Sequence, residues 1–176
     1  MKDLTIVNVV ATANLHQKID LAMLSRVGLA IHDEAVYGGR VAYFKTEEMK
    51  GKISIFASGK MISVGTKNKE DALGDLEKVR DALVNAKIIH PISIETKIQN
   101  TVATLNLRKK LELEDLSVMQ GMVFEPEQFP GGVLKLDKPH KSTVLVFSSG
   151  RLIITGLKNE HQIEQTARYL KEILGS

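Results

Sequence analysis

The chain has 176 residues, 43% of them hydrophobic, and its 24 basic and 21 acidic side chains give a formal net charge of +3. This length fits one domain or two intimately joined halves, and the mild basic excess permits a nucleic-acid partner without requiring one. The lack of cysteine excludes disulfides, Cys-ligated zinc and thiol catalysis. No run of 18 apolar residues and no signal-peptide pattern occurs, so we expect neither a membrane span nor secretion.

The first half of the chain begins with an alternating, strand-like run at residues 4–15. A short helix is predicted at 21–27, with Asp20 as its N-cap. Strand segments bounded by glycine follow at about 28–36, 40–45, 53–57 and 60–66. Ser58-Gly59 predicts a tight turn between the last two strands.

A long amphipathic helix closes the first half. Asn68 is its N-cap candidate, with Asp71 three residues later. The apolar stripe consists of Leu73, Leu76, Val79, Ala82 and Leu83. Residues 88–96, around Pro91, have strand character and lead into the second half.

The second half repeats the first. Residues 6–15 return as residues 98–107 with seven of ten positions identical, and residues 56–68 return as 147–159 with seven of thirteen identical. A period of about 90 residues is too long for a solenoid unit. We therefore expect a two-fold pseudosymmetric domain with repeats at 1–87 and 88–176, which suits a target that is itself roughly two-fold, such as duplex DNA.

Two copies of this layout predict an α+β fold with about ten antiparallel strands, two long helices and two short helices. The helices can cover only one face of such a sheet. Residues 144–147 and 152–154 are nevertheless apolar at consecutive positions, whereas a one-sided sheet alternates apolar and polar residues. The second face is therefore predicted to be an apolar binding surface.

Three motifs, at residues 56–60, 98–104 and 125–131, resemble the TATA-box-binding protein family in the same order and over nearly the whole chain. The start of the chain, without an N-terminal extension, is more similar to archaeal members than to eukaryotic ones. The resemblance implies a saddle: a curved ten-stranded sheet with its helices on the convex face and DNA on the concave face. Altered residues in the first repeat suggest a divergent paralogue.

The function that this resemblance implies is that of a general transcription initiation factor. Such a protein binds and bends A·T-rich, TATA-like promoter DNA through the minor groove. It recruits transcription factor B and the RNA polymerase pre-initiation complex. The resemblance implies no enzymatic activity, no cofactor, no metal, no membrane contact and no small-molecule substrate. It places the protein in the cytoplasm at the nucleoid in an archaeon, or in the nucleus in a eukaryote.

The resemblance also implies a role for individual residues. The aromatic wedges that kink DNA are Tyr37, Phe56, Phe129 and Phe147. The minor-groove floor and its hydrogen bonds are assigned to Asn8, Val10, Ile62, Val64, Asn100, Val102, Leu145, Ile153 and Thr155. Phosphate contacts are assigned to Lys60, Lys135 and Arg151, and the surface for transcription factor B to Glu125 and Glu127. Wedges bend the duplex, and amide donors suit the acceptors that A·T pairs offer in the minor groove.

Ordinary roles remain open for the same residues. Aromatic side chains on strands usually belong to a core, and asparagines often lie at strand edges or turns. Charged residues such as Lys60, Arg151, Glu125 and Glu127 are commonly solvated. A saddle-fold regulatory or protein-interaction module without selective DNA binding is the alternative function, and an enzyme domain is a more distant one. Against the enzyme, the two repeats occupy the entire chain, and no Walker, nucleophile-elbow or paired-carboxylate motif occurs.

The first repeat departs from the family pattern more than the second. Tyr37 stands where the family has phenylalanine, and its hydroxyl is costly to insert dry between bases. Val64 and Ser54 stand where the second repeat has Thr155 and Leu145. These changes predict weaker kinking by the first repeat and a less strict preference for a standard TATA element.

Overall fold

The structure, a computed structural model, describes residues 2–26, 28–33, 35, 37–44 and 46–175. Its elements up to residue 85 are β1 (Leu4–Asn14), α1 (Leu21–Arg26), β2 (Ile31–His32), the 3₁₀ turn η1 (Tyr37–Gly39), β3 (Val41–Phe44), β4 (Lys52–Phe56), β5 (Lys60–Thr66) and α2 (Lys69–Asn85). The remaining elements are β6 (Lys97–Asn106), α3 (Leu113–Leu116), β7 (Met122–Phe124), β8 (Gly132–Leu136), β9 (Ser142–Val146), β10 (Arg151–Leu157) and α4 (Glu160–Gly175).

The strands form one ten-stranded sheet in the order β2-β3-β4-β5-β1-β6-β10-β9-β8-β7. The chain divides into two compact units: unit 1 contains Met1–Val7 and Asn100–Ser176, and unit 2 contains Asn8–Gln99. Strands β1 and β6 run through both units, so each unit contains residues of both repeats. The predicted α+β class, with ten strands and two long and two short α-helices among the described residues, is confirmed.

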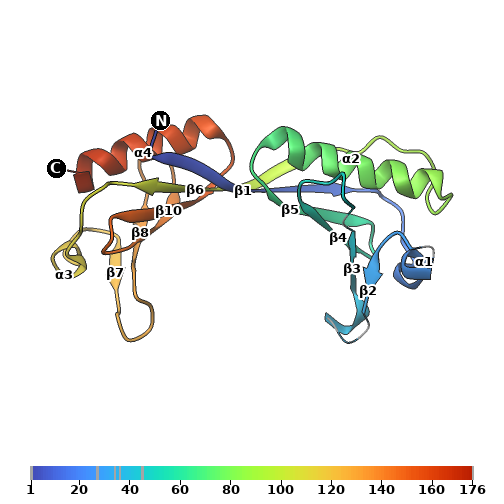
Figure 1. The fold of residues 1–176 in the computed structure, drawn as a ribbon, viewed down its shortest axis with the longest axis horizontal. Helices are drawn as coiled ribbons and strands as arrows, with labels where there is room; N and C mark the ends of the chain where they lie inside the picture. The colour runs from blue at the N-terminus through green and yellow to red at the C-terminus, as the bar shows by residue number, and fades with distance from the viewer. Residues whose placement is uncertain (1, 27, 34, 36, 45, 176) are drawn as a thin grey trace. The chain divides into compact units, whose positions relative to one another are not determined.

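Unit 2 has its core between α2 and one face of its strands (Figure 1). Leu76, Val79 and Leu83 of the predicted stripe are buried, together with Ile53 and Met61 of the sheet. Local capping starts both helices of this unit as predicted. Asn68 Oδ1 accepts a hydrogen bond from Asp71 N at 2.7 Å, and Asp20 Oδ1 accepts one from Met23 N at 3.1 Å.

Unit 1 has the equivalent core between α4 and its strands (Figure 1). The stripe of α4 is buried against the sheet, and its members are Ile163, Ala167, Leu170 and Leu174. Helix α4 begins with a variant of the capping box: Asn159 Oδ1 accepts from Gln162 N at 2.9 Å, and Gln162 Oε1 accepts from Lys158 N, one residue before the cap, at 3.1 Å.

Two strand predictions were wrong. The strand expected at 28–36 is reduced to β2, because Gly28 takes a φ of +72° after α1 and Asp33 Oδ1 accepts from Ala35 N at 2.8 Å in a turn. The stretch at 88–96 joins no ladder. Gln17 occupies both backbone groups of His90, accepting from its N–H at 2.9 Å and donating to its carbonyl at 3.2 Å, and Pro91 has no N–H to offer.

The tight turn predicted at Ser58-Gly59 is confirmed, and the second repeat has the same turn at Ser149-Gly150. Gly59 N donates to Phe56 O at 2.8 Å, and Gly150 N donates to Phe147 O at 2.9 Å. The helices of the described residues are too short or too polar to cross a membrane.

Candidate nucleic-acid interface

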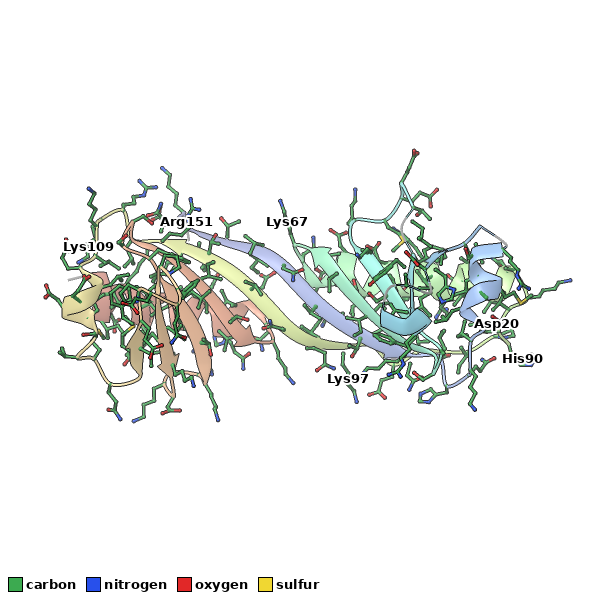
Figure 2. All side chains as sticks on the ribbon, turned by 90° about the horizontal axis from the view of Figure 1, so that it is seen from below. Asp20, Lys67, His90, Lys97, Lys109 and Arg151 are labelled. Atoms are coloured by element: carbon green, nitrogen blue, oxygen red, sulfur yellow. The ribbon has the colours of Figure 1, made fainter. Side chains whose placement is uncertain are left out.

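Alternation along the strands gives each unit two faces. In β1, Val9, Ala11 and Ala13 are buried on the helix side, while Asn8, Val10 and Thr12 are half-buried on the other side. Strand β6 repeats this pattern, with Asn100, Val102 and Thr104 on the side away from α4. We call these helix-free surfaces the open faces of unit 2 and unit 1. Figure 2 views them from the side opposite α2 and α4.

One row of paired residues crosses four strands on the open face of unit 1. Val133 pairs with Leu145, Leu145 with Ile153, and Ile153 with Thr104. All four side chains are half-buried. The row therefore presents three aliphatic side chains and one threonine to a ligand.

The equivalent row in unit 2 is more polar. Tyr43 pairs with Ser54, Ser54 with Ile62, and Ile62 with Thr12. Lys52 Nζ lies 4.3 Å from the centre of the Tyr43 ring, within reach of a cation–π contact. Ser54 stands where unit 1 has Leu145, so the row keeps only one aliphatic side chain, Ile62.

Asparagine side chains fill a β-bulge in each unit. Asn8 Oδ1 accepts a hydrogen bond from Gly65 N at 2.7 Å, and Asn100 Oδ1 accepts one from Gly156 N at 2.8 Å. These glycines have φ values of +91° and +92°, in the left-handed region that favours glycine. Because a backbone N–H can only donate, each amide must turn its oxygen inward, and its Nδ2 group is left as a donor.

The two asparagines differ in what surrounds Nδ2. Asn100 Nδ2 donates to Thr155 Oγ1 at 2.9 Å. Val64 occupies the position equivalent to Thr155, and Asn8 Nδ2 has no hydrogen-bond partner among the described residues. Unit 2 therefore keeps both N–H groups of this amide for a ligand, and unit 1 keeps one.

The structure brings two of the predicted wedges together. The rings of Phe129 and Phe147 lie 5.8 Å apart between centroids at 66°, an edge-to-face pair. Gly131 makes this approach possible: a Cβ there would lie 2.8 Å from Phe129 Cε1 and 3.2 Å from Phe147 Cδ1. Phe56 is half-buried at the end of β4. The side chain of Tyr37, its predicted partner, lies outside what the structure describes.

The predicted phosphate contacts are exposed but do not form one cluster. Lys60 and Arg151 begin β5 and β10 and pair with Asn14 and Asn106 in the neighbouring strands. Lys135 lies in β8, where its N–H donates to Gly121 O at 2.8 Å. Lys60 and Arg151 thus occupy equivalent rims, and Lys135 lies elsewhere in unit 1.

Sequence reasoning missed a basic rim next to Arg151. Arg108 and Lys109 follow β6, and Figure 2 shows Lys109 and Arg151 at the same end of unit 1. Arg108 Nη2 lies 2.5 Å from Asp3 Oδ1, and Lys171 Nζ lies 3.4 Å from Asp3 Oδ2. The hydrogen bond from Arg108 lowers the pKa of the Asp3 carboxyl below its ordinary value of 3.8, with a smaller contribution from Lys171. Asp3 is thus a fixed negative charge in a positive rim.

Glu125 and Glu127 lie in the loop between β7 and β8, and both are exposed. The carbonyl of Glu125 accepts hydrogen bonds from Gln128 N at 2.9 Å and Phe129 N at 3.0 Å. This turn fixes the backbone that carries the Phe129 wedge and leaves both carboxylates in solvent.

Several open-face residues were not named from the sequence. They are Thr12, Tyr43, Thr104, Val133 and Thr143. Their signal was present in the period of two along each strand, because they share the parity of predicted floor residues. Polar or mixed side chains at these positions concealed it.

Comparison with known proteins was made with both sequence and structure. The family profile described as "Transcription factor TFIID (or TATA-binding protein, TBP)" matches residues 3–86 and 95–176. The TATA-box-binding protein of Cenarchaeum symbiosum (strain A) is 36% identical over 164 residues, covering 92% of this chain and 88% of the relative. That of Methanocaldococcus jannaschii is 38% identical over 174 residues, covering 98% and 92%.

The solved structure "Methanococcus jannaschii TBP" matches with a TM-score of 0.79 at 38% identity, covering 98% of this chain and 96% of that one. Fold and sequence agree over nearly the full length of both proteins. The chain therefore belongs to the TATA-box-binding protein family.

Proposed function

We propose that this protein is a general transcription initiation factor that binds and bends A·T-rich promoter DNA through the minor groove. The observation that carries the proposal is the pair of bulge asparagines, Asn8 and Asn100. Each has its oxygen committed to a glycine N–H, so each can only donate outward. In the minor groove, A·T and T·A pairs offer only acceptors, the adenine N3 and the thymine O2.

The apolar residues beside these donors support the same preference. Val10, Val102, Leu145 and Ile153 are half-buried on the open faces. A G·C pair places the guanine amino donor in the minor groove, and an aliphatic floor leaves that donor without an acceptor. The floor therefore tolerates A·T edges and penalises G·C edges.

The aromatic residues supply the bend in this proposal. The Phe129–Phe147 pair of unit 1 is half-buried and inserts together into one base step, while Phe56 acts with Tyr37 in unit 2. Insertion between bases partly unstacks them and kinks the duplex, which lets the protein contact more DNA. Lys60, Lys135 and Arg151 hold phosphates. No chemical step or cofactor is part of this function, and we place the protein at the nucleoid of an archaeal cell.

A direct test compares an A·T-rich duplex with a matched G·C-rich duplex at the same salt concentration, using energy transfer between dyes on the duplex ends. We expect tight, bent binding of the A·T-rich duplex and a loss of about 1–3 kcal/mol for each unfavourable base pair. Equal affinity for both would contradict the proposal and favour the alternative of an interaction module.

Substitution of the two asparagines tests their role as donors directly. Asn100→Asp and Asn8→Asp keep an oxygen for Gly156 N and Gly65 N but replace the outward donor by a carboxylate oxygen. Each variant should fold and lose DNA affinity. Urea denaturation serves as the control for folding, and unchanged DNA affinity in both variants would remove the donors from the interface.

We further propose that Glu125 and Glu127 bind a basic surface of a transcription factor B-like protein, which brings the RNA polymerase pre-initiation complex. Both are exposed on the loop that carries Phe129. Reversal of both to lysine should leave DNA binding intact or slightly tighter, because repulsion of phosphate is removed, and should weaken the ternary complex.

A gel supershift with the cognate factor measures both steps of this partner proposal. The matched control reverses Glu70 and Glu77 on α2, which are exposed and give the same change of net charge. A ternary complex that survives the Glu125 and Glu127 reversal, or DNA binding that is lost with it, would remove this loop from the partner interface.

A further inference from the structure

The two units differ where the sheet meets the long helix. In unit 2, the β3–β4 ladder ends at the pair Phe44–Ile53, and the chain leaves it as the loop 46–51. In unit 1, the β8–β9 ladder continues through Lys135–Thr143 and Leu136–Ser142 before it turns at 137–141. The same place in the fold therefore holds a folded-back loop in one unit and an extended hairpin in the other.

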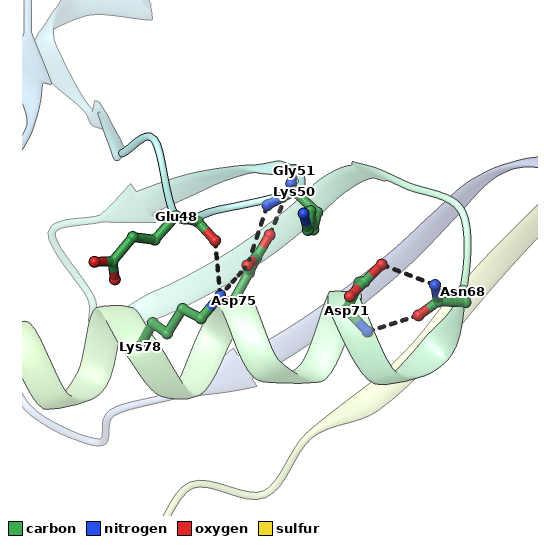
Figure 3. Close-up of polar contacts among 7 residues, drawn as sticks. All are labelled: Glu48, Lys50, Gly51, Asn68, Asp71, Asp75 and Lys78. Carbon is green, nitrogen blue, oxygen red and sulfur yellow. Dashed lines mark hydrogen bonds and ion pairs between the residues drawn. The ribbon is translucent and has the colours of Figure 1, made fainter.

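Hydrogen bonds tie the loop of unit 2 to α2 (Figure 3). Asp75, which is 1% exposed, accepts from Gly51 N at 2.7 Å and from Lys50 N at 3.4 Å. Lys78 Nζ donates to Glu48 O at 2.9 Å and lies 3.4 Å from Asp75 Oδ1. Asp75 and Lys78 thus hold both ends of this short segment against the helix.

The loop buries a methionine and leaves its acidic side chains in solvent. Met49 is only 4% exposed, whereas Glu47 and Glu48 are exposed. Unit 2 therefore shows that this side of the fold can hold a short segment through its backbone and one flexible apolar side chain.

In unit 1 the equivalent residues form the hairpin turn at 137–141, which meets α4 differently: His140 Nε2 lies 2.6 Å from Gln165 Oε1. The 91-residue offset places Thr166 at the position of Asp75 and Tyr169 at the position of Lys78. The Thr166 hydroxyl is buried and has no hydrogen-bond partner within the described ranges. Tyr169 instead lines a groove of about 1360 Å³, together with Ile173, Met119 and Leu136.

The charges around this groove complement an acidic segment. Lys138 and Lys141 line it and are exposed, against one acidic lining residue, Asp137. Lys135, assigned above to a DNA phosphate, lines it as well. Tyr169, Ile173 and Met119 supply the apolar surface between these charges. A basic rim around an apolar floor raises the association rate and the selectivity for an acidic, apolar-tipped peptide.

We propose that this groove of unit 1 binds an acidic peptide segment of a partner protein, which inserts one methionine or leucine against Tyr169, Ile173 and Met119. The bound segment takes the place that the Glu47–Met49 loop occupies in unit 2. The proposal goes beyond DNA binding, and it would stand if the DNA preference proposed above were wrong.

The probe is the peptide Ser-Glu-Glu-Met-Asp-Glu-Ser, added to the full chain without DNA. Spectra of ¹³C-methyl methionine report on both units at once. We expect the Met119 methyl signal to move on titration and the Met49 signal, already buried in unit 2, to stay in place. Fluorescence anisotropy of labelled peptide gives the affinity.

Charge reversal then tests the lysines that line the groove. Lys138→Glu with Lys141→Glu should weaken peptide binding at least about tenfold. The matched control is Lys50→Glu with Lys69→Glu in unit 2, where Lys50 is the counterpart of Lys141, and it should have little effect. A probe with serine in place of its methionine should bind more weakly than the original.

Several outcomes would overturn the proposal. They include a static Met119 signal, an equal shift of Met49, and a rim reversal without effect on the peptide. Loss of A·T-rich duplex binding in the rim variant, without loss of peptide binding, would assign these lysines to DNA phosphate. A Met119 shift that follows protein concentration without peptide would assign the groove to a second copy of the chain.

Discussion

The open faces of the two units share their backbone and differ in their side chains. In unit 1, Val133, Leu145 and Ile153 form an aliphatic row, whereas Tyr43 and Ser54 stand beside Ile62 in unit 2. Both units keep the asparagine that fills the glycine bulge. The duplicated chain has thus retained the feature that orients the donors, while the apolar floor has diverged between the two copies.

The two units also differ on the side of the sheet that carries the long helix. Unit 2 places a buried carboxylate, Asp75, where unit 1 has Thr166, whose hydroxyl has no partner in the described structure. In unit 2, Asp75 and Lys78 of α2 therefore hold a loop, whereas unit 1 has a groove at the equivalent place. The comparison leads to predictions in which equivalent positions of the two units are substituted and the effects compared.

The largest difference is expected in stability. Asp75→Ala should destabilise the protein by about 3 kcal/mol, because it leaves Gly51 N and Lys50 N without their acceptor. Thr166→Val should be neutral or stabilising by about 1 kcal/mol, since it removes a buried hydroxyl that has no partner. Urea denaturation measures both free energies of unfolding. Equal losses of stability would contradict the conclusion that only in unit 2 does this helix position hold a loop.

The next largest difference is expected between the aromatic wedges of the two units. Phe147→Ala or Phe129→Ala should weaken DNA binding by about 2 kcal/mol, roughly thirtyfold, and should reduce bending. Tyr37→Ala should reduce bending less, because the tyrosine hydroxyl is costly to desolvate between bases. Energy transfer across end-labelled DNA reports the bend. A larger loss from Tyr37→Ala would reverse the proposed order of the two ends.

Exchanging the residues at two equivalent positions of the open faces tests the contribution of the apolar floor to DNA binding. Leu145→Ser should weaken binding by about 1 kcal/mol through lost apolar contact, and Ser54→Leu at the equivalent position should strengthen it by a similar amount. Anisotropy titrations with one A·T-rich duplex measure both variants. If Ser54→Leu also weakened binding, the serine hydroxyl itself would be a DNA contact.

The smallest effect concerns Asp3 and its counterpart Glu95. Arg108 lowers the pKa of the Asp3 carboxyl, so its stabilising effect is present above its ordinary value of 3.8 and is lost as pH falls through the lowered value. Asp3→Asn should therefore cost stability at pH 7, and the difference from the parent should shrink in acid. Glu95→Gln should change little, because Glu95 and Lys97 form an exposed pair. Denaturation curves of the parent and both variants at pH 7 and in acid measure these differences in stability.

Much of the fold could be predicted from the sequence because its signals are local. The alternation at 60–66 matches β5, and Asn68 caps α2 as expected, as Asn159 caps α4 in the second repeat. The strand expected at 28–36 was too long, since nothing in its composition revealed the turn that Asp33 makes. The side-chain hydrogen bonds from Gln17 that keep 88–96 out of the sheet span 73 positions.

The site could be predicted only in part, for a related reason. The repeated Asn8 and Asn100 were visible, and so were Gly65 and Gly156. Their hydrogen bonds join strands 57 and 56 positions apart, so the sequence did not reveal which glycine each asparagine meets. Asp75 was missed because a buried carboxylate within an apolar helix stripe has no sequence signal separate from a solvated one. The roles of the wedges and phosphate contacts stay predictions.

The most direct test of minor-groove reading uses inosine. Inosine·cytosine presents the major groove of a G·C pair but lacks the guanine amino group in the minor groove. Anisotropy titrations at one salt concentration compare an A·T-rich site, its G·C-substituted form and its inosine·cytosine form. We predict that the inosine form binds within about threefold of the A·T site, while the G·C form is much weaker. An inosine form as weak as the G·C form would contradict the account, because the open faces would then not be reading the minor groove.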